Sequence, residues 1–190
     1  MNIAVIENDR FLIRPVVLSD KDQFMRIQQE NSEMPNAYKE EDFQESFWEQ
    51  CLAGEGDIYM MIFLKENGAH IGNCSFQNVN MDIIEIGIDI DKTKQNMGLG
   101  TGVLSLLITY LRDHASDQKH RIKTKSNNIP CQKMIEKVGG VKVGEEATEF
   151  DLVMDKMLPT LRKYGMTEQI TETEKMLDRN KGICTFIYEF

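Results

Sequence analysis

The sequence lacks several features that would each define a class of protein. No apolar run approaches the roughly 18 residues of a membrane-spanning helix, and the opening segment MNIAVIENDRF carries charge early and has no apolar centre of a signal peptide. The four cysteines include no Cys-x-x-Cys pair, and the three histidines show no metal-ligand spacing relative to them. We therefore expect no membrane partner, no metal site, and reduced thiols in a cytoplasmic protein.

A surplus of basic residues is also missing. Lysine and arginine total 22 against 31 aspartates and glutamates, giving a net charge of −9. This balance argues against nucleic acid as a partner, because that interaction needs basic surface. It is compatible with a cationic substrate. Acidic residues gather between residues 20 and 57 and basic residues between 92 and 137. Ordinary solvated helix and strand faces would give the same pattern, so both interpretations stay open here.

The length and the composition, 41% apolar and 28% charged, predict a single domain over residues 1–190. Hydrophobic periodicity and turn residues predict strands at about 11–17, 58–65, 70–77, 82–91, 121–125, 141–145 and 183–190. They predict helices at about 20–31, 40–53, 130–138, 150–164 and 171–180, and a long helix ending near 113. Asn67-Gly68 predicts a hairpin, so the three strands from 58 to 91 form an antiparallel meander. We expect Pro159 to kink or split its helix.

The most informative stretch runs from residue 84 to residue 113. A strand with isoleucine at every second position leads into the turn QNMGLGTG at 95–102, which is followed by an amphipathic helix. Three glycines allow the turn to take up positive φ angles and to approach a ligand closely. The free N–H groups at the start of the helix form a ready anion site. The pattern therefore predicts that a ligand with phosphate groups binds here.

Two common phosphate-binding motifs do not fit this turn. A P-loop needs Gly-Lys followed by Ser or Thr, and the turn has none. A dinucleotide fingerprint needs a third glycine where the chain has Val103, and it belongs to the first unit of a parallel sheet. Here antiparallel hairpins precede the turn, so both motifs are excluded.

The segment Gln95-x-x-Gly98-x-Gly100, between a strand and a long helix, resembles the acyl-CoA-binding motif of the GNAT superfamily of N-acetyltransferases. The resemblance extends over about residues 10–145. Arg14-Pro15 followed by Ser19-Asp20 is similar to the family's opening, and Glu85-Ile86-Gly87-Ile88 resembles the RimJ/RimL branch of ribosomal-protein N-terminal acetyltransferases. Asn128-x-x-Cys131 and Glu136-Lys137-Val138-Gly139 resemble a further segment in the expected order.

The resemblance implies the GNAT fold, an α/β (α+β) architecture. Its features are a mixed, twisted sheet with an antiparallel N-terminal half, helices on both faces and, in this chain, a helical insertion at about 148–182 before the last strand. It also implies acetyl-CoA as cosubstrate, held by backbone groups of the glycine turn and along the strand before it. The implied cofactor-binding residues are Ile88, Ile90, Gln95, Asn96, Met97, Gly98, Leu99, Gly100, Thr101 and Asn128. Asn128 could instead only cap the helix that follows it.

The catalytic residue implied by the resemblance is Glu85, acting as a base through water on an amine whose pKa is near 10. An ordinary exposed strand carboxylate is the alternative. The chain departs from the family at three positions. Ile135 stands where many members have a tyrosine acid, so Tyr188 is considered in its place, and Gly140 stands where phenylalanine is usual. Cys131 replaces a small side chain, and we expect a buried thiol, not a nucleophile.

We conclude from the sequence that the chain transfers an acetyl group from acetyl-CoA to a primary amine by direct attack in a ternary complex. The acceptor is a protein N-terminus or a small cationic amine. One alternative is a non-catalytic acyl-CoA-binding regulatory module. The other is a partner-binding domain that uses the insertion at 148–182. Two helices in the insertion could form a lid, a homodimer surface or a packing decoration.

Overall fold

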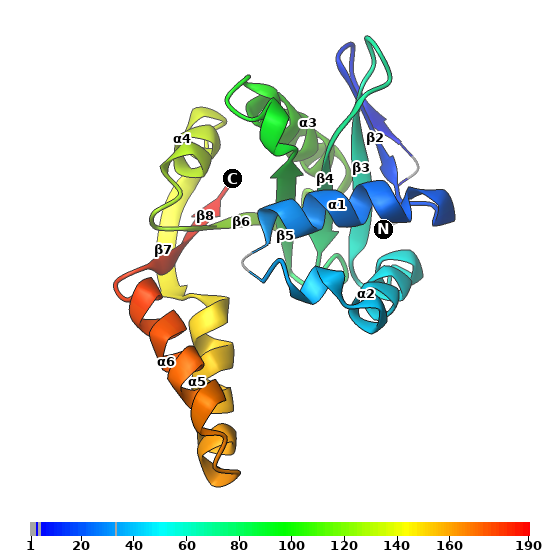
Figure 1. Ribbon diagram of the computed structural model, residues 1–190. Helices are drawn as coiled ribbons and strands as arrows, with labels where there is room; N and C mark the ends of the chain where they lie inside the picture. The colour runs from blue at the N-terminus through cyan, green and yellow to red at the C-terminus, as the bar shows by residue number, and fades with distance from the viewer. Residues whose placement is uncertain (1–2, 4, 33) are drawn as a thin grey trace.

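The computed structural model describes residues 3, 5–32 and 34–190. Within these residues, eight strands form one sheet in the order β1-β2-β3-β4-β5-β6-β8-β7 (Figure 1). The strands are β1 (Ile6–Glu7), β2 (Phe11–Pro15), β3 (Ile58–Leu64), β4 (His70–Gln77), β5 (Ile83–Ile90), β6 (Lys119–Lys125), β7 (Val141–Ala147) and β8 (Cys184–Glu189). The α-helices are α1 (Lys21–Asn31), α2 (Glu41–Ala53), α3 (Leu99–His114), α4 (Ile129–Lys137), α5 (Glu149–Lys163) and α6 (Thr167–Asn180). Three short 3₁₀ helices are η1 (Leu18–Asp20), η2 (Ala37–Lys39) and η3 (Lys92–Lys94).

Within the described chain, neighbouring strands of the sheet run parallel at one place only. All neighbouring strands pair antiparallel except β5 and β6, which are parallel and pair at three positions, Ile83 with Lys119, Ile84 with His120 and Glu85 with Arg121. Beyond these three positions β5 and β6 no longer pair with each other, so the two strands diverge. The mixed sheet with an antiparallel first half is therefore confirmed, and its parallel junction opens toward the end of β5.

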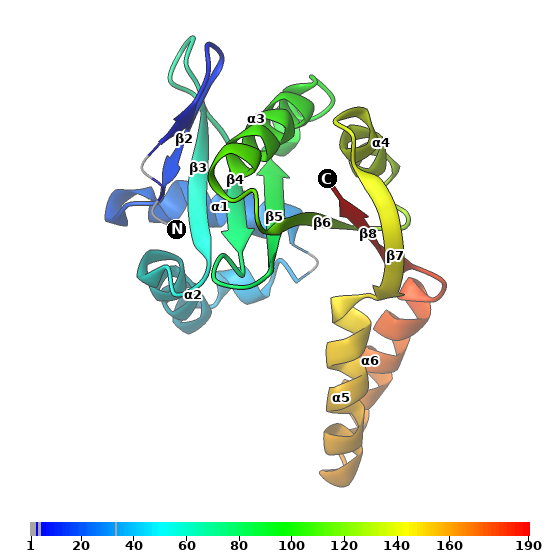
Figure 2. The ribbon, with the colours of Figure 1, turned by 180° about the vertical axis from the view of Figure 1, so that it is seen from behind.

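Helices cover both faces of the sheet, as expected. In Figure 2, α3 lies in front of β4, whereas α1 lies behind the strands and crosses in front of them in Figure 1. The α3 side holds the larger core, to which the helix contributes a row of buried residues: Val103, Leu104, Leu107, Ile108 and Leu111. Fully burying each such side chain contributes about 2 kcal/mol of transfer free energy. A second cluster packs α1 and α2 onto β3 through Phe24, Trp48 and Met61.

The helix and strand predictions are confirmed for most elements, but the two-residue strand β1 was not predicted. Asp20 is the residue before α1, but its carboxylate makes no cap hydrogen bond to that helix. It accepts from both terminal nitrogens of Arg14, at 2.6 and 2.9 Å, and from the Val17 N–H at 2.8 Å. Two hydrogen bonds from a charged guanidinium are stronger than the single hydrogen bond from a neutral backbone N–H that a helix cap would provide. Pro159 lies inside α5 without splitting it, and α6 begins at Thr167, earlier than expected.

The insertion forms a helical hairpin of α5 and α6 between β7 and β8, and it extends away from the sheet (Figures 1 and 2). The two helices pack mainly on each other. Met154, Leu161 and Thr173 are buried in the hairpin, and Arg162 donates to Glu174 at 3.0 Å. Within the described chain, no helix is both long and apolar enough to cross a bilayer.

Candidate active site

The glycine turn presents the start of α3 to solvent. Gly98 caps the helix in a left-handed conformation with φ of 72°, and Asn96 also has a positive φ, 61°. The exposed turn residues are Gln95, Asn96, Met97 and Gly98, whereas the Leu99 side chain is buried in the main core. Leu99 can therefore offer a ligand only its backbone. The N–H groups from Leu99 to Thr101 are at the positive end of the helix dipole, which suits a pyrophosphate.

The turn is fastened to the end of β5 by side chains. Asp91 accepts hydrogen bonds from the N–H and hydroxyl of Thr93, at 2.8 and 2.6 Å, and pairs with Arg26 on α1 at 2.8 Å. These partners hold the pKa of Asp91 at about 2. The Gln95 amide donates to the Ile90 carbonyl at 3.0 Å and to the Asn31 side chain at 3.3 Å. The Gln95 side chain thus orders the turn, and a contact with the cosubstrate remains a prediction.

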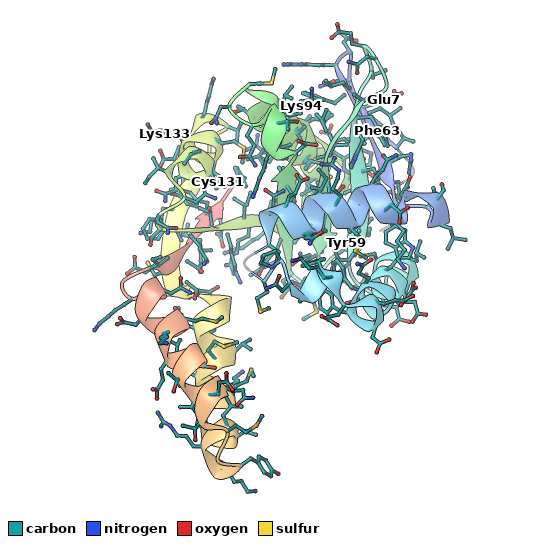
Figure 3. All side chains as sticks on the ribbon, in the orientation of Figure 1. Glu7, Tyr59, Phe63, Lys94, Cys131 and Lys133 are labelled. Atoms are coloured by element: carbon teal, nitrogen blue, oxygen red, sulfur yellow. The ribbon has the colours of Figure 1, made fainter. Side chains whose placement is uncertain are left out.

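The divergence of β5 from β6 lies beside this turn. Ile88 and Ile90 belong to the part of β5 that β6 does not pair with, and their half-buried side chains pack against the main core. The Ile90 carbonyl on that side of β5 already accepts from Gln95, so the Ile88 backbone and the Ile90 N–H are the groups left for a ligand. Across from them, α4 packs against α3. Figure 3 shows Lys94 beside the start of α3, and Cys131 and Lys133 on α4. Lys94 adds positive charge beside the turn.

Glu85 stands at the last position where β5 pairs with β6, and its carboxylate is bound. Lys123 Nζ lies 3.1 Å from Glu85 Oε1 and 3.1 Å from Glu146 Oε1 on β7. The Glu85 carboxylate is therefore already engaged by an ammonium group. A base at Glu85 would have to act within this ion-pair network. The register of a parallel pair depends on distant segments, so sequence reasoning could not find Lys123 as its partner.

Asp89 is a residue that the sequence analysis did not single out. It lies on the same face of β5 as Glu85, because side chains alternate along a strand. Burial raises its pKa to about 6, and its carboxylate accepts a hydrogen bond from Gln28 on α1 at 3.3 Å. The only signal in the sequence was an acidic residue between two isoleucines of a predicted half-buried strand.

The departures from the family pattern have structural reasons. A Cβ at Gly140 would meet Ile135 at 2.4 Å and the Phe190 ring at 2.9 Å, so no larger side chain fits where the family has phenylalanine. The Tyr188 hydroxyl lies inside the fold, 3.5 Å from Glu136 Oε1, and burial raises its pKa. A raised pKa makes it a weaker acid. The pKa of the Cys131 thiol is also raised by burial, which disfavours a nucleophilic thiolate.

Asn128 caps α4, which agrees with the alternative that this residue serves the helix that follows it. Its side-chain oxygen accepts from the Cys131 N–H at 3.2 Å, and a contact with the cosubstrate stays a prediction. In the part of the chain that the structure describes, no group of three or more histidine, cysteine, aspartate or glutamate side chains is arranged to hold a metal ion.

Comparison with solved structures shows the same fold at low sequence identity. A GnaT-family acetyltransferase from Bordetella pertussis superposes with a TM-score of 0.69 at 14% identity, over 98% of this chain and 99% of that chain. Ribosomal-protein-S5-alanine acetyltransferase from Vibrio fischeri gives 0.62 at 16% identity, over 77% and 88%. Spermidine N-acetyltransferase from Vibrio cholerae, in complex with CoA and spermine, gives 0.62 at 16%, over 75% and 87%.

Comparison with curated protein sequences finds no match. The profile of the acetyltransferase (GNAT) domain family matches residues 10–141, which include the glycine turn and the diverging strands. This match spans most of the chain and agrees with the motifs of the sequence analysis, including the ribosomal-protein branch found among the structural neighbours. The chain therefore belongs to the GNAT family of acetyltransferases, and acetyl-CoA is its cosubstrate.

Proposed function

We propose that the protein acetylates a primary amine of a cationic acceptor, a protein N-terminus or a small amine, by direct attack in a ternary complex. The observation that carries the proposal is the coincidence of two features at one place. The start of α3, capped by a left-handed Gly98, lies beside the stretch of β5 that β6 leaves unpaired. A helix N-terminus suits phosphates, and an unpaired strand suits an extended amide-bearing arm.

The cosubstrate-binding roles follow from this geometry. The backbone from Asn96 to Thr101 binds the pyrophosphate, and the backbone of Ile88 and Ile90 binds the extended arm. An N–H near Ile88 polarises the thioester carbonyl. Glu85 is the base proposed from the sequence, acting through water, and its ion pair with Lys123 is the feature that speaks against it.

Two observations support a cationic acceptor. The first turn of α2 carries Glu41 and Asp42, and α1 carries Asp22 in its first turn, so the helices over this face of the sheet are acidic. Among the structural neighbours, one is named for an alanine of a ribosomal protein and one was solved with spermine. Both names describe amine acceptors.

The test has two parts. Acetyl-CoA is titrated calorimetrically into the wild-type protein and into Gly100→Trp, whose added ring would displace Met134 Sδ, only 2.8 Å from an ideal Cβ at this position. Binding by the wild type alone is expected. Release of free CoA thiol is then followed with spermidine and with peptides that begin with alanine or serine, in the wild type and in Glu85→Gln.

A non-catalytic acyl-CoA-binding module remains the second candidate, because Ile135 replaces the usual tyrosine and Tyr188 is buried. It would bind acetyl-CoA and release no thiol with any of these amines.

Three further proposals concern the whole protein. We propose that residues 1–190 form one domain. We also propose a cytoplasmic location, which agrees with four cysteines that form no disulfide. Third, we propose that the protein is a homodimer. The edge strand β7 supports the dimer, because Val141 and Val143 expose 65% and 53% of their surfaces. Light scattering after size-exclusion chromatography would give the mass of the particle, and a monomer at all concentrations would exclude the dimer.

A further inference from the structure

We propose that Asp89 binds the ammonium group of the acceptor and takes its proton. The inference rests on the proposed function, because it assigns a residue to the amine side of the same site. Asp89 lies on β5 four residues beyond Glu85, in the stretch that β6 leaves unpaired. Its side chain is on the face where α1 packs, since Gln28 of α1 contacts it. An acyl group held along the unpaired edge of β5 would lie close to this carboxylate.

The strongest argument is the missing counter-charge. Four other shielded carboxylates have a basic partner within 3.1 Å: Asp20 with Arg14, Asp91 with Arg26, Glu189 with Arg121 and Glu85 with Lys123. Among the described residues, Asp89 has no such partner, and the only hydrogen bond to its carboxylate is the 3.3 Å contact from Gln28. A shielded carboxylate without a cation is unfavourable for folding, so its presence is better explained by a cation that arrives from outside.

Among the described residues, the titratable groups that sense the charge of Asp89 are the Tyr38 hydroxyl in η2, the Cys74 thiol on β4 and the Cys131 thiol on α4. The pKa of each is raised, chiefly by burial and additionally by the charge of Asp89. All three are therefore neutral. Arg26 on α1 is held by Glu30 and Asp91.

The site is also accessible and suited to an alkylammonium group. Asp89 keeps part of its surface open to solvent, and so does Tyr38. The Tyr38 ring packs edge-on against Phe47, with centroids 5.9 Å apart. Aromatic rings beside a carboxylate stabilise an organic cation and the methylene groups next to it. A neutral or anionic acceptor would gain nothing from this environment.

The proton balance of the step is simple. Asp89 takes one proton from the ammonium group, which frees the nitrogen lone pair. The nitrogen then bonds to the carbonyl carbon of the thioester, the carbon–sulfur bond breaks with its electron pair going to sulfur, and the second amine proton ends on that sulfur through water. Asp89 releases its proton to solvent before the next turnover. One ammonium and one thioester thus give one amide, one thiol and one proton.

The test compares Asp89→Asn with Asp82→Asn, a control at an exposed position just before β5. The kcat/KM for spermidine and for an alanine-initiated peptide should fall at least about 100-fold in Asp89→Asn, a typical loss for a proton-accepting group. It should stay within about twofold in Asp82→Asn. The acetyl-CoA affinity should be unchanged in both variants.

The melting temperature separates a functional role of Asp89 from a structural one. Asparagine removes an unpaired charge, so Asp89→Asn should melt a few degrees above the wild type at pH 8. Because burial raises the pKa of Asp89 in the folded state, the wild type should gain stability as the pH falls from about 6 to about 4, and Asp89→Asn should lose this gain.

The outcomes are distinguishable. If the wild type does not bind acetyl-CoA, the proposed function itself fails. If the wild type binds acetyl-CoA but acetylates neither amine, or if Asp89→Asn keeps kcat/KM within threefold, the inference about Asp89 is wrong. A lower melting temperature together with lost acetyl-CoA binding in Asp89→Asn would show a structural role and would equally overturn it.

Discussion

Gly98 and Gly68 form a matched pair for testing the glycine turn. Their φ angles are 72° and 68°, and a Cβ at either position would meet no atom within 4 Å. Alanine at each position therefore introduces the same backbone strain and no clash. A left-handed alanine costs about 1 kcal/mol, which should lower the melting temperature by about 2–4 °C in a chain of this size. Gly98→Ala and Gly68→Ala should show this loss equally.

The two variants should differ in binding. Gly98 caps α3, whereas Gly68 lies in the hairpin between β3 and β4. If the strained turn relaxes around alanine, its N–H groups must be realigned when acetyl-CoA binds. A cost of about 1 kcal/mol weakens the dissociation constant about fivefold. Differential scanning calorimetry and titration calorimetry measure both quantities. Equal dissociation constants in the two variants would refute a role of this cap in phosphate binding.

Three other perturbations have defined outcomes. Cys131→Ser should keep kcat within about twofold in the thiol-release assay, because burial keeps this thiol protonated; a loss above tenfold would instead point to an acetyl-enzyme. The pKa of Asp91, about 2 against an ordinary 3.8, implies stability that is complete above about pH 4 and lost toward pH 2. Urea unfolding should show that Asp91→Asn removes about 1 kcal/mol at pH 7 and flattens this loss. Replacing residues 149–181 with a short glycine-rich turn should leave acetyl-CoA affinity within twofold, because α5 and α6 pack mainly on each other; a larger change would make the hairpin part of the site.

Local signals in the sequence predicted the elements that depend on local physics. Asn67-Gly68 predicted the hairpin between β3 and β4, alternating isoleucines predicted β5, and the leucine pattern predicted α3. The glycine turn could be placed because a glycine at positive φ, followed by a helix whose first turn has no side-chain cap, is recognisable in the sequence.

The electrostatic partners could not be predicted. Asp20 binds Arg14 instead of capping α1, and Glu85 binds Lys123. Both pairings depend on where strands and helices come together in space. The difference between Glu85 and Asp89 is likewise invisible in the sequence, because both are acidic residues on one face of one strand. Only the register of β5 against β6 shows that the first has a lysine and the second has none.

The short junction between β5 and β6 has a mechanical consequence. Three residue pairs join two halves of the sheet, one made of β1 to β5 and the other of β6, β8 and β7. A ligand that bonds to the free edge of β5 and also contacts α4 would connect these two halves and restrict their relative motion. Amide protons of β6 and β8 should then exchange with solvent more slowly in the presence of acetyl-CoA, although neither strand belongs to the glycine turn. The cosubstrate would in this way set the stiffness of the whole sheet.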